Sequence, residues 1–324
     1  MATSGSYDFA ITRDQIITDA MHKYNALGIG SSPTANELTL FSRDLNRVVK
    51  GLQARGIGMW LNKAVAIVPQ YQYKYIDLGT TGGVASICCL RDNLIATQIS
   101  TAAASGASSI VVDSATGVSD TDYIFVELDD GTLQATTVDG DPVGTTITLA
   151  ASLTDDVAVD NMVYSYATSH QLQRPLEILE CNVYNHTSDI ETPVEIVSRE
   201  TYRTLANKAT DGQINQVFYD PQLTNGRLYV WPRSDNVEKY LVATVKYPIE
   251  DFDAAENNPD FPIEWANYLV YSTAASIGDA LGADLNRIGR MEQKAEIELM
   301  RLMALDTDQG SVFFQPDFEG CYGY

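Results

Sequence analysis

The sequence has few of the residues that most enzymes and metal-binding proteins use for chemistry. It contains four cysteines and three histidines in 324 residues. Cys88 and Cys89 are adjacent and the other two cysteines stand alone, so the sequence has no C-x-x-C pair and no zinc-site spacing. No two histidines form a ligand pattern such as H-x-x-x-H. The remaining residues of these types are Cys181, Cys321, His22, His170 and His186. We therefore expect no metal site with cysteine or histidine ligands and no histidine-based catalysis, and the few cysteines fit a reducing compartment.

Motifs for catalysis, nucleotide binding and membrane insertion are also absent. The sequence has no G-x-S-x-G, no glycine-rich phosphate loop and no dinucleotide fingerprint. The first residues have no basic patch followed by an apolar stretch, and no apolar run reaches about 18 residues. We expect no catalytic residue, no cofactor, no signal peptide and no membrane span.

Positive charge is scarce. The chain has 21 Lys and Arg against 43 Asp and Glu, a formal net charge of -22. A protein that reads DNA sequence neutralises phosphates with Lys and Arg, so this balance argues against that class. The excess of carboxylates is compatible with a protein that surrounds DNA without gripping it. The segment 97–169 has no Lys or Arg and carries eleven of the acidic residues.

Both ends of the chain show helical periodicity. Thr12 with Gln15 forms a capping-box pattern, and Thr34 with Glu37 repeats it. Pro262 begins two further periodic segments near the other end. The positions expected to be buried are Ile16, Ala20, Tyr24 and Leu27; Leu38, Phe41, Leu45, Val48 and Leu52; Trp265, Leu269, Ile277 and Leu281; and Leu285, Ile288, Ala295, Leu299 and Leu302. Short connections within each pair favour two antiparallel helix hairpins that pack on each other.

Strand-like patterns fill the middle of the chain, from residue 59 to about 248. Within 97–169 the strands are short and evenly spaced, which is typical of a small β-sandwich or barrel. The fold class that we predict is α+β: a four-helix body from both chain ends, with a β-sheet region and this inserted module. The predicted domains are 1–96 with 170–305 for the body, 97–169 for the acidic β-module and 306–324 for a C-terminal extension.

The acidic module contains three short carboxylate clusters. Hard cations such as calcium take oxygen ligands from loops of this kind. However, Asp-Gly pairs are also typical of tight hairpin turns, and the D-x-[DN]-x-[DN]-G calcium loop is absent. The turn interpretation is favoured and calcium binding stays open. The clusters are Asp120-Thr121-Asp122, Asp129-Asp130-Gly131 and Asp139-Gly140-Asp141.

Two features suggest contacts with partners. Arg43, Arg47 and Lys50 fall at helical spacing and form a basic stripe, which is either a solvated face or a contact with an acidic partner or a neighbouring subunit. The segment after Leu305 has aromatic residues among glycines and a proline, which either dock on a partner or fold back on the chain. The aromatic candidates are Phe313, Phe314, Phe318 and Tyr322.

The stretch from residue 196 to 235, between the two helical ends, has a characteristic order of features: Ser198-Arg199, Tyr202, Lys208, Gly212, Phe218-Tyr219 and Leu228-Tyr229-Val230-Trp231-Pro232. In this order it resembles the head-to-tail adaptor proteins of short-tailed bacteriophages, the tail-tubular-A-like family. The resemblance covers about residues 8–92 and 170–305. Relatives often have a proline shortly after the glycine, where this chain has Gln213-Ile214-Asn215. The segment 97–169 resembles a small β-module of several phage structural proteins.

The resemblance implies a structural virion protein of the neck or tail, made in the host cytoplasm. It implies a ring, usually of twelve copies, between the portal protein and the tail nozzle or tail-tube protein, with a tail fibre as a further candidate partner. DNA passes through the ring without specific binding, and the aromatic C-terminal segment reaches the portal. Two alternatives remain open: a virion-associated cell-wall hydrolase, and a tail protein that binds glycan or the host surface. The three tryptophans lie outside the acidic module, which argues against a glycan-stacking site there.

Overall fold

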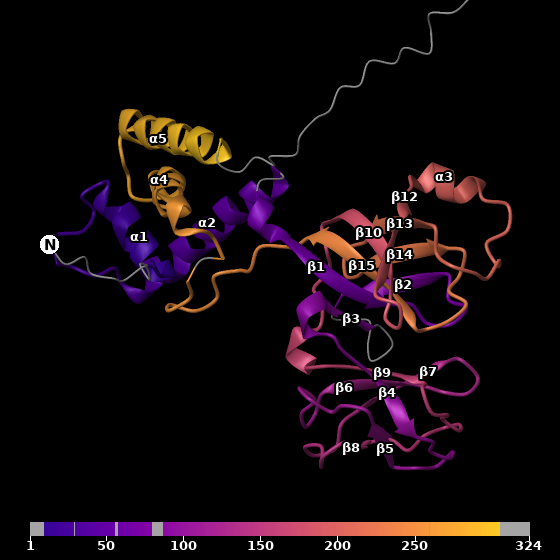
Figure 1. The fold of residues 1–324 in the computed structure, drawn as a ribbon. Coiled ribbons are helices and arrows are strands. Elements are labelled where there is room, and N and C mark those ends of the chain that lie inside the picture. Colours follow the sequence, from indigo (N-terminus) through magenta and orange to yellow (C-terminus); the bar gives the residue numbers. More distant parts are fainter. Residues whose placement is uncertain (1–9, 29, 56–57, 80–86, 259, 305–324) are drawn as a thin grey trace, which may run out of the picture. The chain divides into compact units, whose positions relative to one another are not determined.

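The computed structural model describes residues 10–28, 30–55, 58–79, 87–258 and 260–304 (Figure 1). The chain divides into two compact units, which we call the helical unit and the β unit. The helical unit combines Met1–Trp60 with Ile249–Tyr324, and the β unit is Leu61–Pro248. The helical unit is thus built from two segments that are far apart in the sequence.

Helix α4 organises the helical unit, since it packs against α1, α2 and α5. The helices are α1 (Arg13–His22), α2 (Ala35–Ala54), α4 (Ala266–Ile277, preceded by the 3₁₀ turn η5 at Ile263–Trp265) and α5 (Leu285–Met303). Both predicted capping boxes are confirmed. The hydroxyls of Thr12 and Thr34 accept hydrogen bonds from the backbone three residues on, and the side chains of Gln15 and Glu37 accept from the threonine N–H groups. These caps explain where α1 and α2 begin.

The buried sides of α2 and α5 follow the predicted spacing in part, with Leu38 and Ile288 only half-buried. In α2, Val49 is buried in the place predicted for Val48, because a step of four residues from Leu45 matches the helical period better than a step of three. In α5, Leu285 directly follows the capping residue and remains 78% exposed, so the buried stripe begins at Met291.

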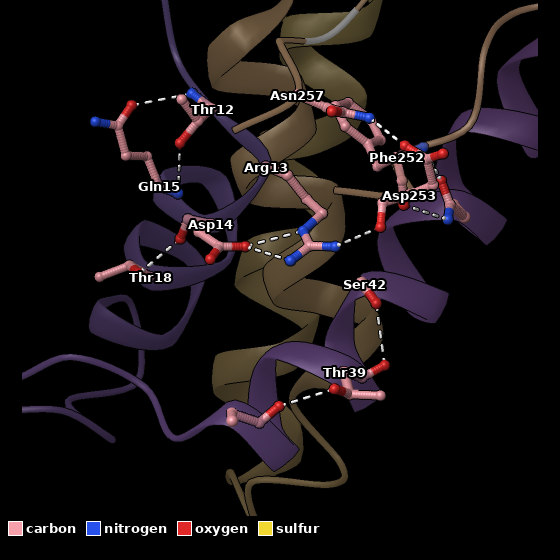
Figure 2. Close-up of polar contacts among 12 residues, drawn as sticks. Thr12, Arg13, Asp14, Gln15, Thr18, Thr39, Ser42, Phe252, Asp253 and Asn257 are labelled. Atoms are coloured by element: carbon pink, nitrogen blue, oxygen red, sulfur yellow. Dashed lines mark hydrogen bonds and ion pairs between the residues drawn. The ribbon is translucent and has the colours of Figure 1, made fainter. Parts of the chain in front are cut away.

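Polar contacts tie the segment after Pro248 to the first two helices (Figure 2). The Arg13 guanidinium pairs with Asp14 at 2.8 Å and donates to the main-chain oxygen of Asp253 at 3.4 Å. Asn46 of α2 exchanges two hydrogen bonds with the backbone of Phe252, at 3.2 and 2.9 Å. The segment that leads back from the β unit is therefore fixed by both helices.

A five-stranded antiparallel sheet lies at the centre of the β unit, in the order β11-β10-β15-β1-β3. Its strands are β1 (Asn62–Val68), β3 (Ile87–Leu90), β10 (Glu177–Asn185), β11 (Ile190–Pro193) and β15 (Lys239–Lys246). Short 3₁₀ turns are η1 (Met59–Leu61), η3 (Arg91–Asn93) and η4 (Thr168–His170). The first and last strands of the unit, β1 and β15, are neighbours in the interior of this sheet.

A four-stranded sheet, in the order β12-β13-β14-β2, shares a core with the five-stranded sheet. Its strands are β2 (Tyr75–Leu78), β12 (Glu195–Ile196), β13 (Gln216–Pro221) and β14 (Gly226–Trp231), and the helix α3 (Arg199–Thr204) follows β12. Val217, Leu228 and Val230 point into this core together with Val65 and Leu241 of the larger sheet. One face of the small sheet is therefore buried, and the alternate residues face the other way.

The acidic segment forms a six-stranded sheet in the order β7-β6-β9-β4-β5-β8. Its strands are β4 (Ile95–Thr101), β5 (Ser109–Val112), β6 (Tyr123–Glu127), β7 (Leu133–Thr137), β8 (Thr146–Thr148) and β9 (Met162–Tyr166). One cluster of aliphatic residues belongs to this sheet alone. A second cluster joins it to the five-stranded sheet, where Phe125 and Tyr164 pack with Tyr240 and Val242.

The predicted four-helix body is wrong as a description of the fold. Over the described residues the chain is mainly β, with three sheets of five, four and six strands, and its four longer helices form only the smaller unit. The reason is that strands far apart in the sequence pair with one another and bury their own cores, as β1 does with β15. The β unit is therefore the larger of the two units and has cores of its own.

Candidate functional site

A row of aromatic side chains crosses the outer face of the four-stranded sheet. In the strand register, Phe218 of β13 lies opposite Tyr229 of β14, and Tyr229 lies opposite Tyr75 of β2. The neighbours of these residues along each strand point into the core, so period-two alternation brings the three rings to one side. The Phe218 and Tyr229 rings stack with centroids 5.7 Å apart, and Tyr75 lies 5.8 Å from Tyr229.

Helix α3 adds a fourth ring to this row. Tyr202 lies 6.0 Å from Phe218 and 5.3 Å from Tyr229, measured between ring centroids, and is almost fully buried. Burial raises the pKa of the Tyr202 hydroxyl. The short helix begins at Ser198, whose hydroxyl accepts a hydrogen bond from the Thr201 N–H at 3.1 Å.

Cationic side chains hold the helix and the following loop on the sheet. Arg199 pairs with Asp220, and its guanidinium lies over the Phe218 ring at 5.2 Å. The Lys208 ammonium donates to the main-chain oxygen of Leu205 at 2.9 Å and lies 5.2 Å from the centre of the Tyr202 ring. Such cation–π contacts fix the orientation of both partners.

These elements enclose a cavity of about 340 Å³, which we call the cationic aromatic pocket. It is lined by Lys74, Tyr75, Arg199, Tyr202, Arg203, Lys208, Phe218, Asp220 and Tyr229. Four cations thus face a single carboxylate, in a chain with a net charge of -22. The volume lies at the small end of the range for ligand pockets, about 300 to 1,000 Å³.

Further contacts beside the pocket make its walls rigid. The Arg227 guanidinium lies 4.2 Å from the centre of the Tyr75 ring and donates to Asp77 at 2.8 Å. Hydrogen bonding to Asp77 raises the pKa of Arg227. The indole N–H of Trp231 donates to the main-chain oxygen of Asn207 at 2.8 Å, which ties the loop after α3 to β14.

The chemistry available in the pocket is that of binding. Its lining offers aromatic surface and positive charge, while its one carboxylate, Asp220, is already paired with Arg199. Among the residues that line it, no second carboxylate, cysteine or histidine stands ready to exchange a proton with Asp220. An anion that carries an apolar or aromatic group matches both properties of this site.

The three residues of the predicted basic stripe, Arg43, Arg47 and Lys50, do not share a binding partner within the described residues. Lys50 donates to the main-chain oxygen of Ile249 at 2.7 Å and pairs with Asp251 at 2.8 Å, so it is used inside the helical unit. Arg47 pairs with Asp44 at 2.6 Å and is mostly exposed. Arg43 is exposed and forms no ion pair with any residue of the described part of the chain. The candidate aromatic residues of the C-terminal segment, Phe313, Phe314, Phe318 and Tyr322, lie outside the described residues.

The carboxylate clusters of the six-stranded sheet behave as turn residues. Asp130 accepts hydrogen bonds from the N–H and hydroxyl of Thr132, which lower the pKa of Asp130. Asp120 accepts from the N–H of Gly140, a residue with a φ of 81°. Within the described ranges, no three His, Cys, Asp or Glu side chains gather as a metal site would require.

The sequence interpretation missed Lys74 and Arg203 as parts of a site, and noted Tyr202, Lys208, Phe218 and Tyr229 only for the family resemblance. The alternation of residues along β14 could have indicated this site. Every second residue of β14 lies on the same face, which places Arg227 beside Tyr229. A strand face that is buried in a core would not carry a cation next to an aromatic ring.

Comparisons with known proteins add no further identification. No protein-family model matches the chain, and no curated protein matches it. In the described ranges, no helix has the length and apolar character needed to cross a membrane.

Proposed function

We propose that the protein is a structural subunit of a ring-shaped adaptor between the head and the tail of a short-tailed bacteriophage. Identical copies form the ring, with the portal protein on one side and the tail nozzle on the other, and genomic DNA passes through it. The order of the residues from Ser198 to Pro232 supports this proposal, because it resembles that of the adaptor family.

The observation that carries the proposal is an apolar strip on the outside of α5. Ile297, Met300 and Met303 follow one another at helical spacing and are exposed, with Met300 at 68%. The opposite side of the same helix buries Leu299 and Leu302 against the unit. A surface helix that is apolar on two sides is typical of a helix with a partner on each side. A second copy of the chain supplies that partner in a ring.

The charge of the chain also bears on assembly. Copies that each carry a net charge of -22 repel one another unless cations are placed at their contacts. Arg43 and Arg47 are exposed cations on α2, in the same unit as the apolar strip. Each would meet an acidic neighbour, and this arrangement favours a head-to-tail ring over a random aggregate.

The same charge supports a conduit for DNA. Passage is fastest when the wall does not bind phosphates, and the acidic segment 97–169 contributes eleven carboxylates and no cation. The adaptor hypothesis therefore explains the excess of acidic residues, whereas a DNA-binding function conflicts with it.

Native mass spectrometry and electron microscopy of the purified full-length chain test the proposal. We expect a closed ring of identical subunits. Met300→Glu and Ile297→Glu should prevent the ring while the circular dichroism spectrum stays unchanged, because each places a charge in the subunit contact. Leu223→Glu is the matched control, since Leu223 is 96% exposed on the β13–β14 turn. A protein that stays monomeric at all concentrations contradicts the proposal.

A further inference from the structure

We infer that the cationic aromatic pocket binds an acidic peptide segment of a partner protein. An aromatic side chain of that segment enters the pocket between Tyr75, Tyr202 and Tyr229, and its flanking carboxylates pair with Lys74 and Arg203. The inference depends on the pocket alone and holds whether or not the chain forms a ring.

The pocket is ready to receive an apolar group without rearrangement. Tyr75 is 40% exposed and the Phe218 and Tyr229 rings are half-buried, so aromatic surface faces the cavity. Arg199 and Lys208 hold the rings of Phe218 and Tyr202 in place through the contacts described above. A rigid pocket loses little conformational freedom when it binds, which favours tight binding of a single side chain.

Two positive charges at the pocket remain to be neutralised. Arg199 is paired with Asp220, and the Lys208 ammonium is held by main-chain oxygens. The side chains of Lys74 and Arg203 are exposed and have no hydrogen bond or ion pair with other described residues. A ligand that brings its own carboxylates satisfies both, and the four cations exclude a basic ligand.

A peptide fits this site better than a nucleic acid does. Nucleic acid carries a phosphate at every nucleotide, so its charge would extend from the pocket over the surface of a chain with a net charge of -22. A peptide can place one or two carboxylates at the pocket and none elsewhere.

Fluorescence anisotropy with the full-length protein tests the inference. The probe is a fluorescein-labelled peptide, Gly-Asp-Glu-Phe-Asp-Glu-Gly. We expect saturable binding that weakens roughly tenfold in each of Lys74→Glu and Arg203→Glu, because each replaces an attraction by a repulsion. Lys239→Glu on β15 makes the same change of charge outside the pocket and should leave binding unchanged. Tyr75→Ala should weaken binding without any change of charge.

Two altered peptides and one oligonucleotide provide the controls. A probe with Phe replaced by Ala, and one with Asn and Gln in place of Asp and Glu, should both bind at least tenfold more weakly than the original. The inference is overturned if either binds equally well, if Lys239→Glu weakens binding as much as Arg203→Glu does, or if the original probe shows no saturation. Tighter binding of a twelve-nucleotide oligo-dT at the same residues would overturn it in favour of nucleic acid. Mass spectrometry of the same samples reports the ring separately, so failure of one proposal is distinguishable from failure of the other.

Discussion

At the scale of single residues, Gly226 decides where Tyr219 can lie. A β-carbon at Gly226 would be 2.1 Å from the Tyr219 hydroxyl oxygen and 2.4 Å from its Cε2 atom. The ring is held in this position, because it packs against the shared core of two sheets and its hydroxyl donates to the main-chain oxygen of Pro175 at 2.5 Å. Only glycine leaves room for this arrangement at the start of β14.

Gly226→Ala should therefore lower the free energy of unfolding by about 1 to 3 kcal/mol, the usual cost of overpacking. Urea denaturation measures the change. Gly51→Ala in α2 is the matched control, since a β-carbon there meets no atom within 4 Å and should stabilise the helix slightly. In a Tyr219→Leu background the Gly226 substitution should cost much less. An equal cost in both backgrounds would mean that the ring is not the obstacle.

The three described cysteines should be unreactive in the folded protein. Cys88, Cys89 and Cys181 are buried free thiols, and burial raises the pKa of Cys89 and of Cys181 to about 12. The thiolate is the reactive form, so labelling with iodoacetamide at pH 8 should be slow. In a Cys321→Ser variant we expect three labels per chain in guanidinium and almost none in buffer, counted by mass spectrometry. Rapid labelling in buffer would show that the sheets open on the timescale of the reaction.

The raised pKa values of the buried thiols also predict how stability depends on pH. Because unfolded thiols ionise near pH 8.5, the free energy of unfolding should fall as pH rises from there toward 12.

At the scale of elements, the sequence predicts where helices and strands lie better than it predicts their partners. The capping boxes at Thr12 and Thr34 have local causes, and the structure confirms both. The acidic segment also forms short strands, as its turn spacing predicts, for example β6 at Tyr123–Glu127 and β9 at Met162–Tyr166. Pairing depends on residues far apart in the chain, so the sheet orders were not predictable from local periodicity. For the same reason the cationic aromatic pocket was missed, since β2 and β14 meet only across about 150 residues.

The cap of α2 offers a direct measurement of a local contribution. Thr34→Ala removes the side chain that accepts from the Glu37 N–H, and should lower the free energy of unfolding by about 1 kcal/mol. Thr39→Ala is the control, because the Thr39 hydroxyl only donates back to the main-chain oxygen of Ala35 within the helix and contributes little (Figure 2). Thermal unfolding followed by circular dichroism compares the two. If both substitutions lower the free energy of unfolding equally, the capping position of Thr34 contributes nothing beyond that of a threonine inside the helix.

At the scale of the whole molecule, the distribution of charge and the burial of apolar residues suggest different domain boundaries for the segment 97–169. Half of the net negative charge lies in 97–169, which argues for a separate module. Apolar burial argues otherwise, because Phe125 and Tyr164 of that segment pack with Tyr240 and Val242 of the five-stranded sheet. The Tyr164 hydroxyl also donates to the main-chain oxygen of Val237 at 2.7 Å. The module is thus continuous with the β unit through one buried face while it keeps an aliphatic core of its own.

Removal of the module distinguishes these two descriptions. Ile95 lies opposite Ser165 in antiparallel register, so the ends of the segment are adjacent and a short Gly-Ser linker can replace residues 96–166. This deletion uncovers Tyr240 and Val242, and we expect the protein to bind the dye ANS strongly and to aggregate. With Tyr240→Lys and Val242→Lys added, the shortened chain should stay soluble, bind little dye and retain the strand signal in circular dichroism. If the doubly substituted chain is also insoluble, the six-stranded sheet is required for folding of the β unit. If the simple deletion stays soluble without binding the dye, the shared cluster contributes nothing that the remaining chain cannot cover.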